Sequence, residues 1–471
     1  MAIFFTEGEV KNRPGVYQRH TNVGHTKQNP ANDGICAIPI RASWGPLGKV
    51  LKNLNTTALK ANYGSGTYGT GYTVPAAAAM FDAGASIVYT YRLGTGGKAA
   101  ALVLEEGLTV TAKYPGTMAI SVAIQAKLGD ATKKQFLVYV GTTQTELWEF
   151  AADEAAEGAN LIEATADSKY VTVTGAAVKV SELAVASGAL TGGEDPTVTN
   201  EDYSNAFAAL EVSYYNCIAL DVDDDEDMTL SLLLQEYLKG AYQFGKLGIA
   251  VVGEKTTVPF ETRLQHAAMF NDAKVVYLGG GYMAGNQNKD GVLAICRAAG
   301  DIAKTPCNEG ITHAVIDEAT DLCETLSFSQ YVAAINAGAL MLSKSSDGAI
   351  WYDSGINTLT VPEPGTQDKG WKKIRRVKTR FEMIDRMDRA LNPKVGRIPA
   401  DSDGIADVIQ TGQRVLDAMI TERKLLPGAT FTEDSDNPFS GDSAYFIIRA
   451  DDIDSLEMIY LQYQFRYSQN S

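Results

Sequence analysis

The sequence has no apolar run long enough to cross a membrane. Its longest apolar stretch, residues 331–342, is interrupted by Asn336 and Gly338 and falls short of the roughly 20 residues that span a bilayer. The N-terminus lacks the basic start, the long apolar segment and the small-residue cleavage site of a signal peptide. We therefore expect no membrane insertion and no export by the usual secretory route.

Cysteine and histidine are also scarce. The five cysteines are widely spaced and form no CxxC pair, which argues against a disulfide framework and against a zinc knuckle. None of the four histidines lies in an HExxH motif, and no serine lies in G-x-S-x-G. We expect no catalytic residue, no metal-binding residue and no bound cofactor. Cys36, with its apolar neighbours, is interpreted as a core thiol.

Positive charge is in deficit, because 41 lysines and arginines face 57 acidic residues and leave a formal net charge of −16. A protein needs a positive surface to bind phosphates, so nucleic acid is not expected as a direct partner. Hydrophobic residues make up 45% of the chain and charged residues 21%, which is typical of soluble globular proteins. A chain of 471 residues has room for about two to four domains.

Residues 1–25 are expected to form an extended N-terminal arm. Pro14 prevents a helix at its position and favours an extended conformation at Arg13. The strand-like piece 16–19 carries Tyr17, whose ring needs an apolar surface for packing. That surface can belong to another subunit.

Strand-like and helix-like segments alternate in residues 26–97 and again in residues 194–349. The first part contains the strand-like run ICAIPIRA and an expected helix over residues 49–63. The alternation predicts a multidomain α/β and α+β protein with an open α/β core, of which residues 26–97 are the first part.

Residues 98–193 differ in composition. They are rich in Ala, Val, Thr and Gly and contain short alternating runs such as LTVTAKY and KKQFLVYVG. Strands of this length between turn residues predict an inserted β-sandwich of immunoglobulin-like type. Glycines flank the insertion on both sides and are expected to let it reorient: Gly94, Gly96, Gly97, Gly192 and Gly193.

Residues 350–450 are expected to form a C-terminal domain with helices over 375–391 and 405–425. Residues 451–471 follow as a C-terminal strand arm. Alternation along this strand places one set of side chains on one face and Met458, Tyr460, Gln462, Gln464 and Arg466 on the other. The first set is Ile459, Leu461, Tyr463, Phe465 and Tyr467.

Two segments could carry chemistry of another kind. Asp221 and residues 223–227 form an acidic run after a predicted strand, where carboxylates can bind a divalent ion, but capping of the helix that begins near Met228 is the favoured interpretation. Residues 64–69 match G-x-G-x-x-G, yet a helix-like segment precedes them and no helix follows. Nucleotide binding is therefore not favoured.

One dense basic run breaks the acidic pattern. Six of the ten residues 371–380 are cationic. They either form a solvated helix face or contact an acidic partner surface, since clustered cations orient docking.

These segments together resemble one known family, the sheath proteins of contractile phage tails, of the type found in defective prophages of Gram-positive bacteria. The resemblance is carried by the order of short motifs along nearly the whole chain. They are NRPGVY at 12–17, WGP at 44–46, LTVTAKYPGTMAISVAIQA at 108–126, NCIALDVDDDEDM at 216–228, IDEATDLCE at 316–324, WKKIRRVKTRFEMIDRMDRAL at 371–391 and IDSLEMIYLQYQFRY at 453–467.

The resemblance implies a structural protein rather than an enzyme. Subunits of such sheaths form a helical polymer, organised as stacked six-fold rings around an inner tail tube, with baseplate and tail terminator proteins as further partners. Arms from one subunit join a sheet in its neighbours. The implied arm contacts are Val16, Tyr17, Arg19, Ile459, Leu461, Tyr463 and Phe465, and the implied tube contacts are Lys372, Lys373, Arg375 and Arg376.

The sheath interpretation implies a location in a virion tail or tail-like bacteriocin, made in the cytoplasm of the bacterial host. Contraction would drive the tube through a target cell envelope. Two alternatives stay open: an α/β metal- or nucleotide-dependent enzyme with a β-domain insertion, and another virion component such as a tube or baseplate protein. A tube subunit is usually far shorter, and type VI secretion sheaths are split between two chains.

Overall fold

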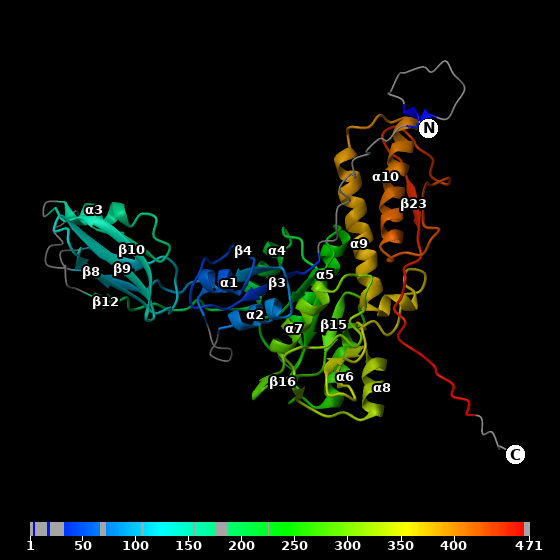
Figure 1. Cartoon of the computed structure of the whole chain (residues 1–471), viewed down its shortest axis with the longest axis horizontal. Coiled ribbons are helices and arrows are strands. Elements are labelled where there is room, and N and C mark those ends of the chain that lie inside the picture. The colour runs from blue at the N-terminus through cyan, green and yellow to red at the C-terminus, as the bar shows by residue number, and fades with distance from the viewer. Residues whose placement is uncertain are drawn as a thin grey trace.

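The computed structural model of the chain describes residues 3–4, 17–18, 33–65, 72–104, 108–153, 156–175, 187–224 and 226–465. A central α/β body lies between a β-sandwich and a helical C-terminal unit, and the last described residues run away from the body (Figure 1). No helix within these residues is long and apolar enough to cross a membrane.

The central body is built on a seven-stranded sheet with the order β19-β15-β14-β13-β3-β5-β4. All neighbours are parallel except β4 and β5. Because β3 pairs with both β5 and β13, the segments before and after the insertion form one sheet. The strands are β3 (Ile35–Ile40), β4 (Val50–Asn53), β5 (Ile87–Arg92), β13 (Cys217–Ala219), β14 (Ile249–Gly253), β15 (Val275–Leu278) and β19 (Ala339–Leu340).

Helices cover both faces of this sheet, so strands such as β3 and β14 are buried throughout and have continuous apolar sequences. One face packs against α1 (Thr56–Tyr63), α2 (Val74–Asp82) and α7 (Val292–Lys304). The other face packs against α4 (Asn200–Leu210), α5 (Thr229–Gln243), α6 (Phe260–Phe270) and α8 (Phe328–Ala337). The predicted open α/β core is confirmed.

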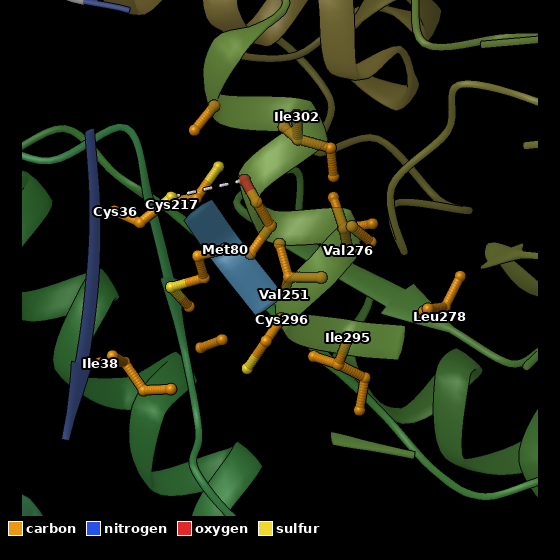
Figure 2. Close-up of a cluster of buried hydrophobic side chains, with 14 of the residues drawn as sticks. Cys36, Ile38, Met80, Cys217, Val251, Val276, Leu278, Ile295, Cys296 and Ile302 are labelled. Atoms are coloured by element: carbon orange, nitrogen blue, oxygen red, sulfur yellow. Dashed lines mark hydrogen bonds between the residues drawn. The ribbon is translucent and has the colours of Figure 1, made fainter. Parts of the chain in front are cut away.

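The core beneath α2 and α7 holds three of the free cysteines. Cys36, Cys217 and Cys296 lie among Ile38, Met80 and other apolar side chains (Figure 2). Burial raises the pKa of all three thiols well above the ordinary value. The interpretation of Cys36 as a core thiol is confirmed.

The helix expected over residues 49–63 is wrong in its first half. Residues 50–53 form β4 instead, because they pair with β5 at the edge of the sheet. The helix α1 begins only after Asn55, whose side-chain oxygen accepts a hydrogen bond from the Ala58 amide at 2.8 Å.

The insertion consists of two antiparallel sheets around one apolar core, as expected for a β-sandwich. Its order is β10-β9-β8-β12 in one sheet and β11-β7-β6 in the other. The immunoglobulin-like type stays a prediction. The elements are β6 (Ala101–Val103), β7 (Thr109–Ala112), β8 (Ile120–Ala126), β9 (Lys133–Val140), β10 (Thr143–Ala151), α3 (Glu157–Ala164), β11 (Val171–Thr174) and β12 (Ser187–Ala189).

The sandwich is packed firmly onto the central body. Arg92, which is fully buried, donates hydrogen bonds to the carbonyl oxygens of Ala42, Gly45 and Pro115 and so ties the end of β5 to the sandwich. Trp44 reaches from the central body into the sandwich core. Its ring centroid lies 5.0 Å from that of Tyr114 and 5.9 Å from that of Tyr170.

The two connectors between the bodies also pair with each other. Isolated bridges join Thr95 to Thr197 and Lys98 to Glu194, and the Lys98 and Glu194 side chains form an ion pair. The reorientation expected at the flanking glycines would have to break these bridges and the contacts of Trp44.

The C-terminal unit contains two long helices and a β-hairpin around a small core. Its expected start at residue 350 is wrong, because that residue lies in a hairpin of β20 and β21 that belongs to the central body. The two expected helices are confirmed. The elements are η3 (Lys369–Lys372), α9 (Ile374–Leu391), η4 (Asn392–Lys394), α10 (Ser402–Thr421), β22 (Thr430–Glu433) and β23 (Phe446–Arg449).

Short strands complete the described fold. β1 (Ile3–Phe4) pairs in parallel with β2 (Tyr17–Gln18). The remaining strands form small antiparallel sheets at the edge of the central body: β16 (Tyr282–Ala284), β17 (Gln287–Lys289), β18 (Asp321–Leu322), β20 (Leu342–Lys344) and β21 (Ile350–Tyr352).

The close approach at Gly116 allows a test of the packed sandwich. Gly116 has a positive φ of 143°, and a Cβ there would lie 2.0 Å from the carbonyl oxygen of Ser43. Gly129 also has a positive φ, but a Cβ there meets nothing within 4 Å. Gly129→Ala should cost only the backbone strain of about 1–2 kcal/mol. Gly116→Ala should cost on the order of 3 kcal/mol or more, because it also separates the two bodies.

Urea unfolding of the two variants measures this difference. Equal losses of unfolding free energy would show that the contact between sandwich and central body contributes nothing.

Candidate functional site

Within the described residues, the C-terminal segment exposes a continuous row of large apolar side chains. We call residues 451–457 the arm base and residues 458–465 the terminal strand, after the strand that the sequence predicts there. Within the described chain residues 458–465 form no strand, because no second strand pairs with them. No backbone hydrogen bond joins residues 454–465 to the rest of the described chain. The apolar side chains of the terminal strand are 70–94% exposed: Met458, Ile459, Tyr460, Leu461, Tyr463 and Phe465. Such a row of apolar side chains with unpaired backbone groups is a template for pairing with another chain.

Two contacts agree with the predicted alternation of faces. The rings of Tyr463 and Phe465 stack with centroids 6.4 Å apart, so these side chains share one face. The hydroxyl of Tyr460 lies 3.4 Å from the sulfur of Met458, so these two share the other face. Arg466 and Tyr467 lie outside the described residues.

The arm base is held against α9 by ion pairs. Arg376 contacts both carboxylate oxygens of Asp452, at 2.9 Å from Nε and 2.6 Å from Nη2. Arg380 adds a contact of 3.2 Å to the same carboxylate and lies 4.4 Å above the ring of Trp371. Asp368 lies 3.2 Å from Arg380 on the solvent side. A two-oxygen contact of this kind fixes geometry as well as charge.

A second anchor lies at the other end of the arm base. Lys373 forms an ion pair with Glu457, and the Thr312 hydroxyl donates to the same carboxylate at 3.0 Å. Arg375 donates to the Ser455 hydroxyl at 2.9 Å. Beyond Glu457 these contacts end.

The solvated helix face considered for the basic run is wrong, since Arg375 is only 8% exposed. All four implied tube contacts have partners within the chain. Arg376 binds Asp452, Lys373 binds Glu457, and Arg375 binds Ser455 and the Cys307 carbonyl oxygen. Lys372 donates to the carbonyl oxygen of Ile335 at 2.7 Å. Lys373 and Arg376 therefore contact acidic side chains of the chain's own arm base. The tube contact stays a prediction.

Asp452, Glu457 and Thr312 were not predicted from the sequence. A charge pattern was available for the first two, because three aspartates and a glutamate stand within 451–457 of a chain with one basic run. Nothing local signals Thr312, which is brought to the site by the segment between α7 and β18.

The N-terminal arm contacts are only partly covered. Tyr17 pairs with Ile3 through β2 and β1, whereas Val16 and Arg19 lie outside the described residues, as does the side chain of Tyr17. Their predicted contacts with neighbouring subunits stay predictions.

The acidic run at the end of β13 caps helices, as favoured from the sequence. The Asp224 carboxylate accepts from the amides of Leu230 and Ser231 at the start of α5. Asp223 accepts from the Val292 amide at the start of α7 and lies 2.7 Å from Lys255. Asp225 is outside the described residues, which contain no group of three potential metal ligands.

The crevice where the strand order reverses, between β3 and β13, is filled by side chains. Asp221 is fully buried there and accepts hydrogen bonds from the hydroxyls of Thr73 and Tyr203, with Arg41 4.0 Å away. Open α/β sheets bind ligands at this position. In the G-x-G-x-x-G match, Gly64 ends helix α1 rather than following a strand, and residues 66–69 lie outside the described part.

One family model and two relatives match the sequence. Residues 196–358 match the family model of the phage tail sheath protein central domain. The uncharacterized protein YqbK of Bacillus subtilis is 26% identical over 376 residues, which cover 76% of this chain and 75% of YqbK. The phage-like element PBSX protein XkdK of the same organism is 23% identical over 421 residues, which cover 85% of this chain and 86% of XkdK.

Solved structures give the same fold. The sheath tail protein of Desulfitobacterium hafniense matches with a TM-score of 0.70 and 21% identity over 93% of this chain and all of that chain. The corresponding values for a sheath tail protein of Listeria innocua are 0.70 and 18%, over 90% of this chain and 96% of that chain. The helical sheath of the anti-feeding prophage in its contracted state matches with a TM-score of 0.53 and 11% identity, over 97% and 99%.

The fold is therefore that of a contractile tail sheath protein. Residues 196–358 match the central domain of phage tail sheath proteins, and one relative is a phage-like element protein, which confirms the resemblance carried by the sequence motifs.

The Asp452 ion pairs should withstand mild acid. Burial raises the pKa of Asp452, but the hydrogen bonds from Arg376 and the charges of Arg380 and Arg376 outweigh burial and leave this pKa below its ordinary value. A carboxylate with a lowered folded-state pKa stabilises the fold above its unfolded pKa of about 4 and loses this effect as the pH falls through the lowered value.

We therefore expect exchange of the Ile453 amide, which donates to the Lys424 carbonyl oxygen, to stay constant from about pH 7 to about pH 5 after correction for its intrinsic pH dependence, and to rise only below about pH 4. Exchange that already rises at about pH 5 to 6 would show that another group controls the arm base.

Proposed function

We propose that the chain is a structural subunit of a contractile tail sheath, which polymerises around an inner tube and contracts to drive the tube through a target cell envelope. The observation that carries this proposal is the terminal strand, which is exposed, apolar and unpaired within the described chain. A strand of this kind has no stable place in a solitary soluble subunit. The subunit has no enzymatic role in this proposal.

The terminal strand joins a sheet of a neighbouring subunit. Strand addition satisfies backbone donors and acceptors at an open edge and gives affinity without a deep pocket. Each backbone hydrogen bond contributes only about 1 kcal/mol, but a polymer repeats it at every subunit. The β22–β23 hairpin is a suitable receiver, because it has only two strands and a two-stranded sheet is marginally stable alone.

An arm that pairs with a different surface on the next subunit makes a head-to-tail contact. Contacts of this type continue indefinitely unless they close into a ring, whereas a two-fold contact stops at a dimer. The fold shared with the contracted sheath of the anti-feeding prophage supports a helical, contractile assembly. Stacked six-fold rings, an inner tube protein, and baseplate and terminator proteins complete the proposed particle, a virion tail or a tail-like bacteriocin.

Contraction in this proposal needs no nucleotide. Subunits assemble in an extended state and move to a packing of lower free energy, while the arms keep neighbours connected. Because Arg92 and Trp44 fix the sandwich to the central body, these two bodies move as a unit. Tube contact by the basic run remains part of the proposal. Lys372 suits a test of it, since its partner is a carbonyl oxygen and not an anion.

The two faces of the terminal strand allow a matched test of strand addition. Tyr463→Asp with Phe465→Asp places charges on the apolar face and should abolish tubular polymers, because the face can no longer be buried in a neighbour's sheet. Gln462→Asp with Gln464→Asp makes the same change in charge on the opposite face and should leave polymers in place. Negative-stain electron microscopy of the purified full-length chains measures both.

Deletion of residues 458–471 should give the same loss as the first variant. If the unaltered chain remains monodisperse even with tube protein added, the sheath proposal is wrong. If it polymerises and both variants polymerise equally well, strand addition through this face is wrong.

A further inference from the structure

One helix, α9, binds both the central body and the arm base through cations on different sides. Positions 373, 376 and 380 are three and four residues apart and so lie along one side of the helix. Lys373, Arg376 and Arg380 on that side contact Glu457 and Asp452. The arm base is therefore connected to α9 along more than one helical turn.

The adjacent side of α9 is fixed to the central body. Lys378, which is only 8% exposed, donates to the carbonyl oxygen of Ile302 at 2.6 Å, at the C-terminal end of α7. This is where a helix leaves carbonyl groups without partners and favours positive charge. Arg375 donates to the Cys307 carbonyl oxygen, and Glu382 accepts from the Cys307 thiol. A continuous set of buried polar contacts thus joins α7, α9 and the arm base.

The anchors hold the arm base at two separated points. Near Asp452 the backbone also pairs with the loop after α10, through Leu426 N to Asp451 O at 2.8 Å and Ile453 N to Lys424 O at 3.0 Å. Five residues further on, the Glu457 side chain is only 18% exposed. The next side chain, Met458, is 72% exposed. Two fixed points define a direction, and the terminal strand begins directly after the second.

We propose that Asp452 and Glu457 are positioning residues that set the direction in which the terminal strand leaves the subunit, so that a second copy of this chain receives it in one register. Through α9 the same contacts pass tension on the arm to the central body. This inference depends on the proposed function for its partner, but the geometry of the arm base can be tested on the monomer.

The first test removes both anchors without adding bulk, through Asp452→Asn with Glu457→Gln. Its control is Asp451→Asn with Asp454→Asn, which makes the same change in charge at exposed positions of the same segment. The anchor variant should exchange the Ile453 amide at least about tenfold faster by hydrogen–deuterium exchange, because local opening controls exchange. Its yield of tubes should fall by about tenfold, while the control matches the unaltered chain.

The second test replaces the anchor by a reversible covalent bond. Leu425 and Asp452 face each other as an antiparallel bridge, and the hydrogen bonds of their neighbours make them a pair with close Cα atoms. Leu425→Cys with Asp452→Cys can therefore form a disulfide. With Glu457→Gln in the same chain, tubes should form when the disulfide is oxidised and be lost when it is reduced. Leu425→Ala with Asp452→Ala controls for the loss of the buried leucine.

The possible outcomes separate the two proposals. Unchanged exchange in the anchor variant overturns the inference. Faster exchange with normal tubes, or no restoration by the disulfide, also overturns the positioning role and leaves the sheath function intact. If the unaltered chain forms no tubes, the sheath proposal fails, and the inference fails with it because no second copy receives the strand.

Discussion

The pairing of β3 with β13 is the contact on which the rest of the molecule depends. It places the backbones of Cys36 and Cys217 side by side, although the whole inserted sandwich lies between them in the sequence. The seven-stranded sheet is thus assembled from two distant parts of the chain. Because this pairing brings the two flanks of the insertion together, the chain enters and leaves the sandwich at neighbouring points. There Arg92 and Trp44 hold the sandwich against the central body. Helix α7 packs on the same sheet, and Lys378 of α9 donates a hydrogen bond to the Ile302 carbonyl oxygen at the C-terminal end of α7.

Partly buried ion pairs connect separate segments of this protein. The chain has a net charge of −16, yet a dense group of cations stands at the start of α9. Lys378 in this group binds the end of α7, and Arg376 binds Asp452 of the arm base. Ion pairs that are half-buried are screened less by salt than exposed pairs, so they can hold a segment in a fixed place. These ion pairs hold the arm base up to Glu457, and the apolar residues after it have no backbone partner within the described chain.

Much of the fold was predictable because its signals are local. Buried strands such as β14 have short continuous apolar runs. In α9 and α10, apolar residues recur at helical spacing over many turns. The error at residues 49–63 has a physical reason: β4 is an edge strand whose state depends on pairing with β5, and its sequence VLKN has no strong preference. The alternation of the terminal strand was predictable, since a period of two needs no partner.

The sequence by itself determined the class of the protein, the α/β core, the inserted sandwich and the alternation of side chains along residues 458–465, because patterns of apolar residues, charge and motif order are local properties. Only the tertiary structure decided what the basic run does. Arg376 and Asp452 are 76 residues apart, and Lys378 meets the end of α7 at a similar separation. Ion pairs between such distant positions leave no periodic trace in a sequence, because they form only after the sheet has placed α7 and α9 side by side.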